Sequence, residues 1–92
     1  YHNTAVLIGK EGKILHVYRK VHCRSFESVE GQGLFTPGDT FFVTERHYAQ
    51  GRLRVGTMIC FDREIVETVR CLRAAGAQFI ACPLATNTYS LY

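Results

Sequence analysis

The stretch "VGTMICFDREIVETVRCLRAAG", Val55 to Gly76, decides the fold because two kinds of hydrophobic pattern meet inside it. Its first residues form an apolar run that is typical of a buried strand, and this run stops at Cys60. After the cysteine, Asp62 is placed to cap a helix, an apolar stripe recurs at spacings of four and three residues, and Gly76 is placed to end the helix. The stretch therefore predicts a strand, a turn that carries a thiol, and a helix.

The rest of the chain predicts further strands on both sides of this unit. Short runs rich in β-branched and aromatic residues, separated by turn residues, are typical of strands. The expected strands are residues 4–9, 13–20, 41–46, 52–60 and 77–85. Residues 23–40 contain three Gly and one Pro without sustained periodicity, which favours a long ordered loop. We therefore predict an α/β (α+β) fold with the order β-β-loop-β-β-α-β.

Composition limits the classes of function. A chain of 92 residues with 47% hydrophobic and 21% charged residues is typical of one small globular domain. Its net charge of +3 comes from basic residues scattered along the chain, which argues against a nucleic-acid partner. No apolar stretch approaches the roughly 20 residues that cross a bilayer, so we expect no membrane partner.

The four cysteines are Cys23, Cys60, Cys71 and Cys82, and they show neither a C-x-x-C pair nor the spacing of zinc ligands. Their number permits two disulfides in an oxidising compartment. Cys71 and Cys82 lie on apolar segments, however, where cysteine commonly packs as a small hydrophobic residue. We therefore expect free thiols, no metal and a cytoplasmic protein.

Cys60 has two interpretations at this point. A turn from strand to helix would hold its sulfur at an exposed corner, where the helix N-terminus favours the thiolate, as in many nucleophiles. A buried cysteine that closes a strand is the alternative. The residue type and its position do not separate the two.

Three segments taken together favour the nucleophile. They are "VYRKVH" at residues 17–22, "LFTPGD" at 34–39 and "RVGTMICFDREIVET" at 54–68, and in this order they resemble the nitrilase superfamily of carbon–nitrogen hydrolases. The resemblance extends over nearly all of the chain. It implies a four-layer αββα sandwich, of which residues 1–92 would be a partial domain that lacks its N-terminal and C-terminal portions.

The resemblance also implies a Glu-Lys-Cys triad that needs no metal or organic cofactor. Lys20 matches the family lysine, and Cys60 matches the family nucleophile. The backbone N–H of Phe61 would be the second oxyanion donor beside Lys20. The general-base glutamate would lie upstream of Tyr1.

Several neighbouring residues receive supporting roles from the same resemblance. A further glutamate of the family helps to hold the lysine and the substrate; we choose Glu30, and Glu27 is the rival because the loop "FESVEGQG" allows either register. His22 is expected to shape the loop beside Lys20 rather than to act as a base. Asp62 and Arg63 are expected to serve structure, as a helix cap and an ion-pairing group.

The resulting hypothesis is a thiol amidohydrolase that hydrolyses a small-molecule amide, N-carbamoyl compound or nitrile through a Cys60 thioester, and that forms a homo-oligomer at full length. The alternative is a diverged, non-catalytic relative that acts in binding or assembly. A redox-active thiol protein has less support, because no resolving cysteine is adjacent to Cys60 in sequence. The substrate itself is not assigned, since "DREIVET" departs from the family pattern after Cys60.

Overall fold

The computed structural model describes residues 1–24, 27 and 33–85. The elements are β1 (Thr4–Ile8), β2 (Ile14–Arg19), β3 (Val43–Tyr48), β4 (Gly51–Thr57), the short 3-10 helix η1 (Cys60–Glu64), α1 (Val66–Ala74) and β5 (Phe79–Ala81). This confirms the predicted α+β class and the predicted order of strands and α-helix. No helix in the described ranges is long and apolar enough to cross a membrane.

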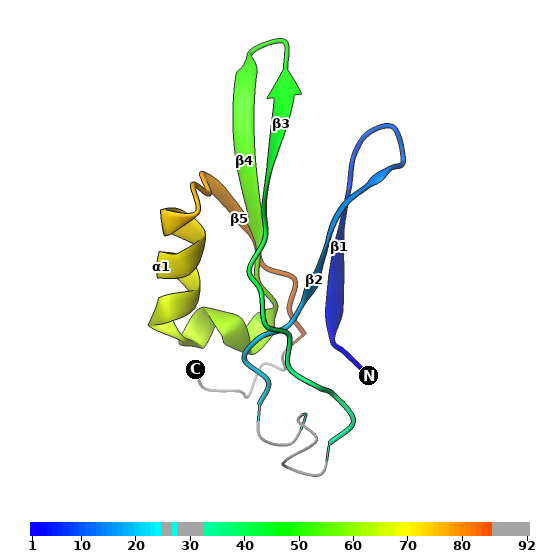
Figure 1. Ribbon diagram of the computed structural model, residues 1–92, viewed down its shortest axis with the longest axis vertical. Coiled ribbons are helices and arrows are strands. Elements are labelled where there is room, and N and C mark those ends of the chain that lie inside the picture. Colours follow the sequence, from blue (N-terminus) through cyan, green and yellow to red (C-terminus); the bar gives the residue numbers. More distant parts are fainter. Residues whose placement is uncertain (25–26, 28–32, 86–92) are drawn as a thin grey trace.

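The strands form two small sheets (Figure 1). β1 and β2 pair as an antiparallel hairpin, with Val6 opposite Val17. β3 and β4 form a second antiparallel hairpin, and β5 adds to β4 in parallel, as a strand that follows a helical crossover does. The unit β4–η1–α1–β5 is therefore the strand–turn–helix stretch with its return strand.

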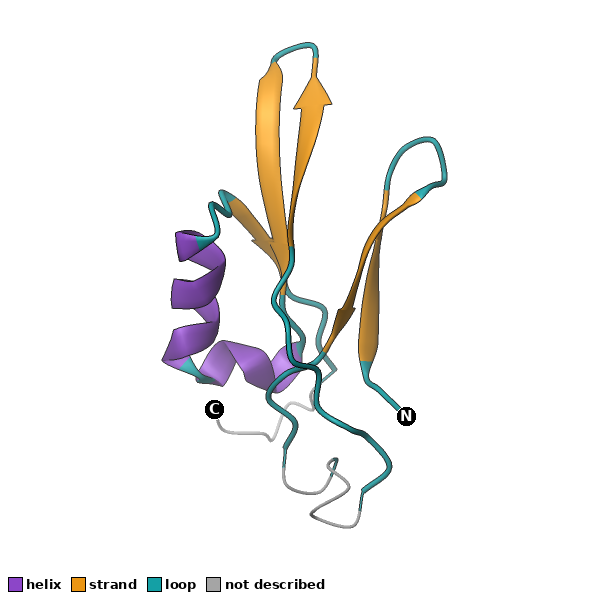
Figure 2. Ribbon diagram, in the orientation of Figure 1, coloured by secondary structure: helices purple, strands orange, loops and turns teal. Residues whose placement is uncertain are grey.

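The elements stack in three layers (Figure 2). On one face of the β3–β4–β5 sheet, Gly56 lies under α1 so closely that a Cβ there would be 3.0 Å from Leu72 Cδ2. On the other face, His16 of β2 lies 2.8 Å from Thr57 Oγ1 of β4 and 2.7 Å from Thr44 Oγ1 of β3. Gly56 and Thr57 are consecutive, so they face opposite sides of the strand. The layers therefore run helix, sheet, hairpin.

The helix region differs from the prediction. A single helix capped by Asp62 was expected, but η1 ends at Glu64 and α1 begins only at Val66, after Ile65 adopts an extended conformation with φ −100°. Asp62 lies inside η1 and does not cap α1, but its carboxylate accepts from the amide of Ile59, the residue that precedes η1, at 3.0 Å. The same carboxylate also binds groups from β2 and the following loop, so Asp62 combines a local capping contact with tertiary contacts.

Some element ends also differ. β3 continues through Tyr48, and a turn of two residues leads to β4, which begins at Gly51. The φ of Gly51 is 136°, a conformation that favours glycine. β4 ends at Thr57 rather than at Cys60, and β5 covers only three residues. Strand β4 thus ends before the cysteine, but backbone hydrogen bonds to the chain at and after β5 continue, from the Met58 amide to Ala81 O and from the Cys60 amide to Pro83 O, each at 3.0 Å.

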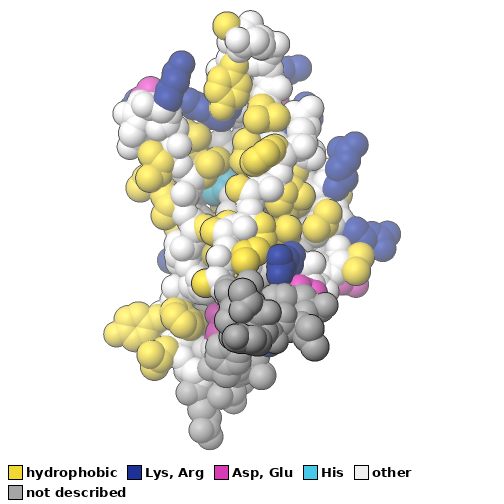
Figure 3. All heavy atoms as spheres, turned by 180° about the vertical axis from the view of Figure 1, so that it is seen from behind, with side chains coloured by type: hydrophobic (Ala, Val, Ile, Leu, Met, Phe, Trp, Pro, Cys, Tyr) yellow, Lys and Arg dark blue, Asp and Glu magenta, His cyan; other side chains and the backbone are white. Residues whose placement is uncertain are grey.

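The core is small and the outer face of the hairpin is apolar. The buried hydrophobic residues among those described are Tyr18, Val55, Ile59, Leu72 and Ala77. The outer face of β1 and β2 instead exposes Val6, Ile8, Ile14 and Val17. Seen from the side opposite to Figure 1, hydrophobic side chains gather across the middle of the molecule (Figure 3).

Candidate active site

Cys60 occupies a strained turn between β4 and η1. Its φ of 44° makes it the one non-glycine residue with a positive φ in the described part of the chain. This left-handed conformation costs on the order of 1–3 kcal/mol and persists only where surrounding contacts hold it. The Cys60 amide donates to Pro83 O at 3.0 Å, which ties the turn to the chain after β5. The thiol itself is partly exposed.

Lys20 lies just beyond the end of β2 and is buried, with 2% of its surface exposed. Its backbone is held on both sides, since its amide donates to Asn3 O and its carbonyl accepts from the Gly38 amide, each at 2.8 Å. Its ammonium donates to Glu27 Oε1 at 2.6 Å. A buried ammonium is costly unless it is paired, so this carboxylate stabilises the charged form.

Glu27 accepts hydrogen bonds from three directions. Besides Lys20 Nζ, its donors are the Arg24 amide at 2.9 Å and Asn3 Nδ2 at 3.2 Å. Partial burial by itself would raise the pKa of the Glu27 carboxyl, but the bond from Lys20, then those from Arg24 and Asn3, outweigh burial and hold the pKa below its ordinary value. Glu27, the rival in the sequence analysis, therefore pairs with the lysine as an anion. Glu30, our choice there, lies outside the described residues.

Gly38 explains the Pro-Gly-Asp segment. A Cβ at this position would overlap the carbonyl oxygen of Arg19, so only glycine allows this approach to the end of β2. The contact brings the Gly38 amide to the carbonyl of Lys20. The second sequence motif thus holds the backbone of the lysine in the first.

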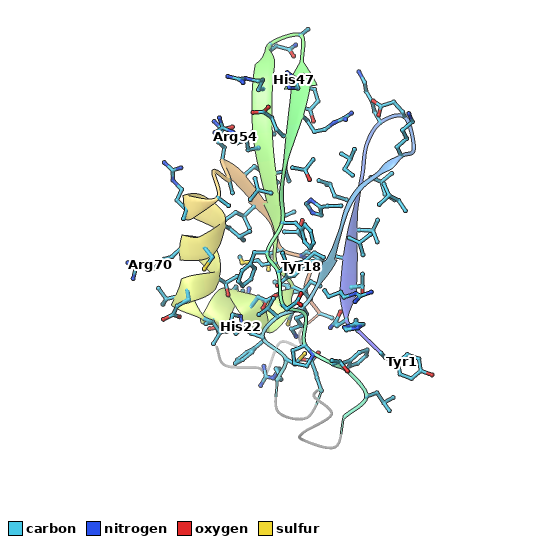
Figure 4. The ribbon with its side chains drawn as sticks, viewed as in Figure 1. Tyr1, Tyr18, His22, His47, Arg54 and Arg70 are labelled. Carbon is cyan, nitrogen blue, oxygen red and sulfur yellow. The ribbon has the colours of Figure 1, made fainter. Side chains whose placement is uncertain are left out.

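Asp62 joins the lysine segment to the cysteine turn. It is fully buried, and its Oδ2 accepts from Tyr18 Oη at 2.5 Å and from the Ile59 amide at 3.0 Å. Its Oδ1 accepts from the His22 amide at 2.8 Å and lies 3.1 Å from His22 Nδ1. Tyr18 and His22 both lie close to η1 (Figure 4). Burial, followed by the bond to Asp62, raises the pKa of the Tyr18 hydroxyl, so it remains a donor at neutral pH.

Phe61 follows the cysteine in the first turn of η1. The first backbone bond of this turn runs from the Asp62 amide to Ile59 O at 2.9 Å, so the Phe61 amide precedes the hydrogen-bonded ladder. Its ring lies under the guanidinium of Arg24, 5.4 Å from the ring centroid to Cζ. An amide in this position has no partner within the helix itself.

The predicted site residues thus lie on two segments that contacts join. Tyr18 and His22 flank Lys20, Asp62 follows Cys60 by two residues, and the bonds between them connect the segments. His22 shapes this junction. There is no local signal in the sequence for Tyr18 or for the tertiary partners of Asp62, because Tyr18 and His22 are 44 and 40 positions away from Asp62. The expected capping contact of Asp62 is present at the start of η1, not of α1.

The other supporting residues have simpler surroundings. Arg63 Nε lies 3.3 Å from Glu64 Oε1, in an ion pair at the corner as expected. Thr68 of α1 is buried, and its Oγ1 lies 3.1 Å from His22 Nδ1. Within the described ranges, no group of three His, Cys, Asp or Glu side chains could hold a metal ion.

Comparison with known proteins agrees with this geometry. The family profile "Carbon-nitrogen hydrolase" matches residues 1–91. The chain is 39% identical over 82 residues to a nitrilase of Pyrococcus abyssi, which covers 89% of this chain and 28% of that protein. It is 32% identical to the human omega-amidase NIT2, over 94% of this chain and 32% of that protein.

Solved structures show the same likeness. An amidase from Nesterenkonia sp. superposes with a TM-score of 0.74 at 29% identity, over 95% of this chain and 31% of that one. Nit3 of Saccharomyces cerevisiae, a member of the nitrilase superfamily, superposes with a TM-score of 0.74 at 28% identity, over 95% of this chain and 29% of that one. The chain thus spans less than a third of the length of these relatives. With a profile match over nearly its whole length and the fold of these structures, the chain belongs to the carbon-nitrogen hydrolase family, within the nitrilase superfamily.

Proposed function

We propose that the whole protein is a thiol amidohydrolase that hydrolyses a non-peptide carbon–nitrogen bond in an amide, an N-carbamoyl compound or a nitrile. The observation that carries the proposal is the left-handed turn at Cys60, which presents a partly exposed thiol at the end of a strand. Backbone strain at a non-glycine residue is concentrated at functional sites. A purely structural cysteine would not need it.

For an amide, the reaction has two steps. A carboxylate takes the proton of Cys60, the thiolate attacks the carbonyl carbon, the carbon–nitrogen bond breaks, and the amine leaves with the proton that the carboxylic acid returns. The carboxylate then takes a proton from water, which attacks the thioester; the carbon–sulfur bond breaks, the acyl group leaves as a carboxylic acid, and the proton returns to the thiolate. Following the family resemblance, the carboxylic acid is a glutamate upstream of Tyr1.

Lys20 and Phe61 stabilise the oxyanion in both steps. The Lys20 ammonium supplies a fixed positive charge, and the Phe61 amide supplies a backbone donor. Glu27 keeps Lys20 charged and in place, as its 2.6 Å contact with the ammonium supports. No metal or organic cofactor takes part in these steps.

The relatives support this chemistry and suggest what to assay. In a variant of the Nesterenkonia amidase, the acetamide moiety of fluoroacetamide is added covalently at the active-site cysteine. Relatives of this chain include an N-carbamoylputrescine amidase of Solanum tuberosum and the human omega-amidase. Amides and N-carbamoyl amines are therefore the first substrates to test.

The decisive experiment measures ammonia release by the whole protein and its variants. We expect Cys60→Ala to abolish turnover and Lys20→Ala to lower kcat by about 10²–10³-fold, the loss typical of one oxyanion donor. Cys71→Ala, which removes an exposed thiol on α1, is the matched control and should leave kcat unchanged. Glu27→Gln and Glu30→Gln, compared side by side, identify the glutamate that serves the lysine; we expect the larger loss for Glu27.

Two results would overturn the proposal. Turnover that survives Cys60→Ala would reject the thioester, and near-normal kcat with Lys20→Ala would reject the role of the lysine. An unmodified protein that folds but releases no ammonia from any amide, N-carbamoyl compound or nitrile would favour the binding or assembly function instead.

A further inference from the structure

Asp62 is fully buried, and its carboxylate accepts hydrogen bonds from the Tyr18 hydroxyl, the Ile59 amide and the His22 amide, while His22 Nδ1 lies 3.1 Å from Oδ1. A buried carboxyl group is tolerated only where hydrogen bonds replace water, and here three donors and the His22 imidazole surround it. Each of its oxygens faces a backbone amide that can only donate, so the NH₂ group of a neutral amide would not fit at either place. Asp62 is therefore held by specific hydrogen bonds and not by packing alone.

The groups that surround the carboxylate come from the two segments that the proposed reaction must bring together. Tyr18 and His22 stand two residues before and two residues after Lys20. The Ile59 amide immediately precedes Cys60. One carboxylate group thus holds both sides of the lysine segment and the entrance to the strained cysteine turn.

Tyr18 and His22, the outer members of this hydrogen-bond network, are each held by further contacts. Tyr18 is fully buried, and its hydroxyl oxygen also accepts from the Val21 amide at 3.2 Å, which places the turn that follows Lys20. His22 Nδ1 lies 3.1 Å from Thr68 Oγ1 on α1, so the same imidazole reaches the helix behind the cysteine. A shift of the carboxylate would therefore move both segments.

We propose that Asp62, together with Tyr18 and His22, is a positioning residue that sets the relative placement of the Lys20 ammonium and the Cys60 thiol. The inference rests on the proposed function, because it assigns these two groups to one reaction. Asp62 touches no substrate in this arrangement. It acts by holding the backbone from which both groups project.

The test uses two substitutions in the whole protein. Asp62→Asn keeps the size of the side chain but turns one acceptor oxygen into an NH₂ group that faces two donors, of which one is a backbone amide that cannot accept. We expect kcat to fall by about 10²-fold, the cost of a misplacement near 1 Å, while KM changes little. Tyr18→Phe removes one donor and keeps the ring, and we expect about a tenfold loss of kcat.

Non-additivity separates positioning from general loss of stability. If both substitutions act through the same carboxylate, the double variant should be no slower than Asp62→Asn alone. The matched control is Thr57→Val, which removes a buried hydrogen bond between β4 and His16 without touching Asp62. The control should lower the Tm by a similar amount and leave kcat of the folded protein unchanged.

The alkylation rate of Cys60 gives a readout besides turnover. With a small haloacetamide, Asp62→Asn and Tyr18→Phe should slow labelling of Cys60, and Thr57→Val should not. A folded Tyr18→Phe variant with unchanged kcat and an unchanged rate of Cys60 labelling would overturn the inference. This comparison remains decisive even if Asp62→Asn does not fold. Turnover that persists in Cys60→Ala would overturn the proposed function. If Cys60→Ala loses turnover, but Tyr18→Phe keeps the kcat and the labelling rate of the Thr57→Val control, then only the positioning role is overturned.

Discussion

The four thiols lie in different surroundings, although they belong to one small domain. Burial, helped by the negative charge of Glu27, raises the pKa of Cys23. Burial also raises the pKa of Cys82, against the opposing effects of the Cys60 amide and Arg63. Cys71 is exposed on α1, and Cys60 is partly exposed at its strained turn. The thiolate is the reactive form, so these differences should appear as different rates of alkylation.

We predict that brief iodoacetamide treatment of the folded whole protein labels Cys60 first, then Cys71, and that Cys23 and Cys82 react last. The reason is that a nucleophile must be accessible as a thiolate, whereas burial keeps the other two in the neutral form. Mass-spectrometric mapping of the labelled sites over time measures the order. Faster labelling of Cys71 or Cys82 than of Cys60 would contradict the assignment of the nucleophile, and labelling in denaturant, where the four rates should converge, is the control.

The Lys20–Glu27 pair shows why activity and stability must be measured together. Removing one partner of a buried ion pair typically costs about 3–5 kcal/mol, because the other charge is left without compensation. Lys20 is buried and Glu27 nearly so. A loss of turnover in a Glu27 variant therefore indicates that Glu27 positions Lys20 only if the Tm shows that the variant is folded.

His16 joins the hairpin β1–β2 to the other sheet. Its two ring nitrogens lie within hydrogen-bond distance of Thr44 on β3 and Thr57 on β4, and its ring stacks on Phe42 at 5.8 Å between centroids. Burial lowers the pKa of His16 below its ordinary value of about 6.5. The contact between the two sheets therefore depends on a neutral imidazole.

We predict that the whole protein loses stability in acid partly through His16. Above about pH 6.5 the imidazole is neutral in the folded and the unfolded chain, and the stability is fully present. As the pH falls from there toward the lower folded pKa, the unfolded chain binds more protons than the folded chain, so the free energy of unfolding decreases. Denaturation curves between pH 7.5 and pH 5 measure this slope.

Two variants test whether His16 causes this dependence of the free energy of unfolding on pH. His16→Asn should flatten it, because the titrating group at the contact between the sheets is gone. His47→Gln replaces an exposed histidine on β3 and should leave the slope as it is. An equal slope in His16→Asn and in the unmodified protein would show that His16 does not couple folding to pH.

At the scale of the molecule, the described residues leave the outer face of the β1–β2 hairpin without a covering layer. Helix α1 covers the β3–β4–β5 sheet, and the hairpin covers its other face, but the outer face of the hairpin exposes Ile8 and Ile14 at 60% and 63%. Domains bury the apolar face of a sheet against another layer. The fourth layer of an αββα sandwich would lie on this face.

We predict that residues 1–92 alone associate in solution and release no ammonia from amides, N-carbamoyl compounds or nitriles. Exposed contiguous apolar surface favours association, and the carboxylic acid of the proposed mechanism is placed outside these residues. Light scattering gives the size, and Ile14→Lys should shift it toward the monomer. Gln50→Lys, which adds the same charge at the β3–β4 turn, is the control and should not. A monodisperse monomer with turnover that depends on Cys60 would show that this segment is complete as a catalyst.

The sequence by itself determined the strand–turn–helix unit and the order of the strands, because periodicity and turn residues act between near neighbours. It also placed Lys20 and Cys60 on matching motifs, although their roles stay predictions. Tertiary structure alone decided that the Asp62 carboxylate, besides its local bond from the Ile59 amide, binds Tyr18 and His22, because these two residues lie far from it in the chain.

Tertiary structure likewise decided that Glu27 meets Lys20. From the sequence we chose Glu30, with Glu27 as the rival, and Glu30 lies outside the described residues. The loop between the first two motifs carries no periodic pattern, and the contact of Glu27 at 2.6 Å depends on how the loop folds back onto the end of β2. The same holds for Gly38, whose need for glycine comes from the backbone of Arg19, distant in sequence. Contacts between segments far apart in the chain depend on how the folded chain packs, so no local sequence pattern predicts them.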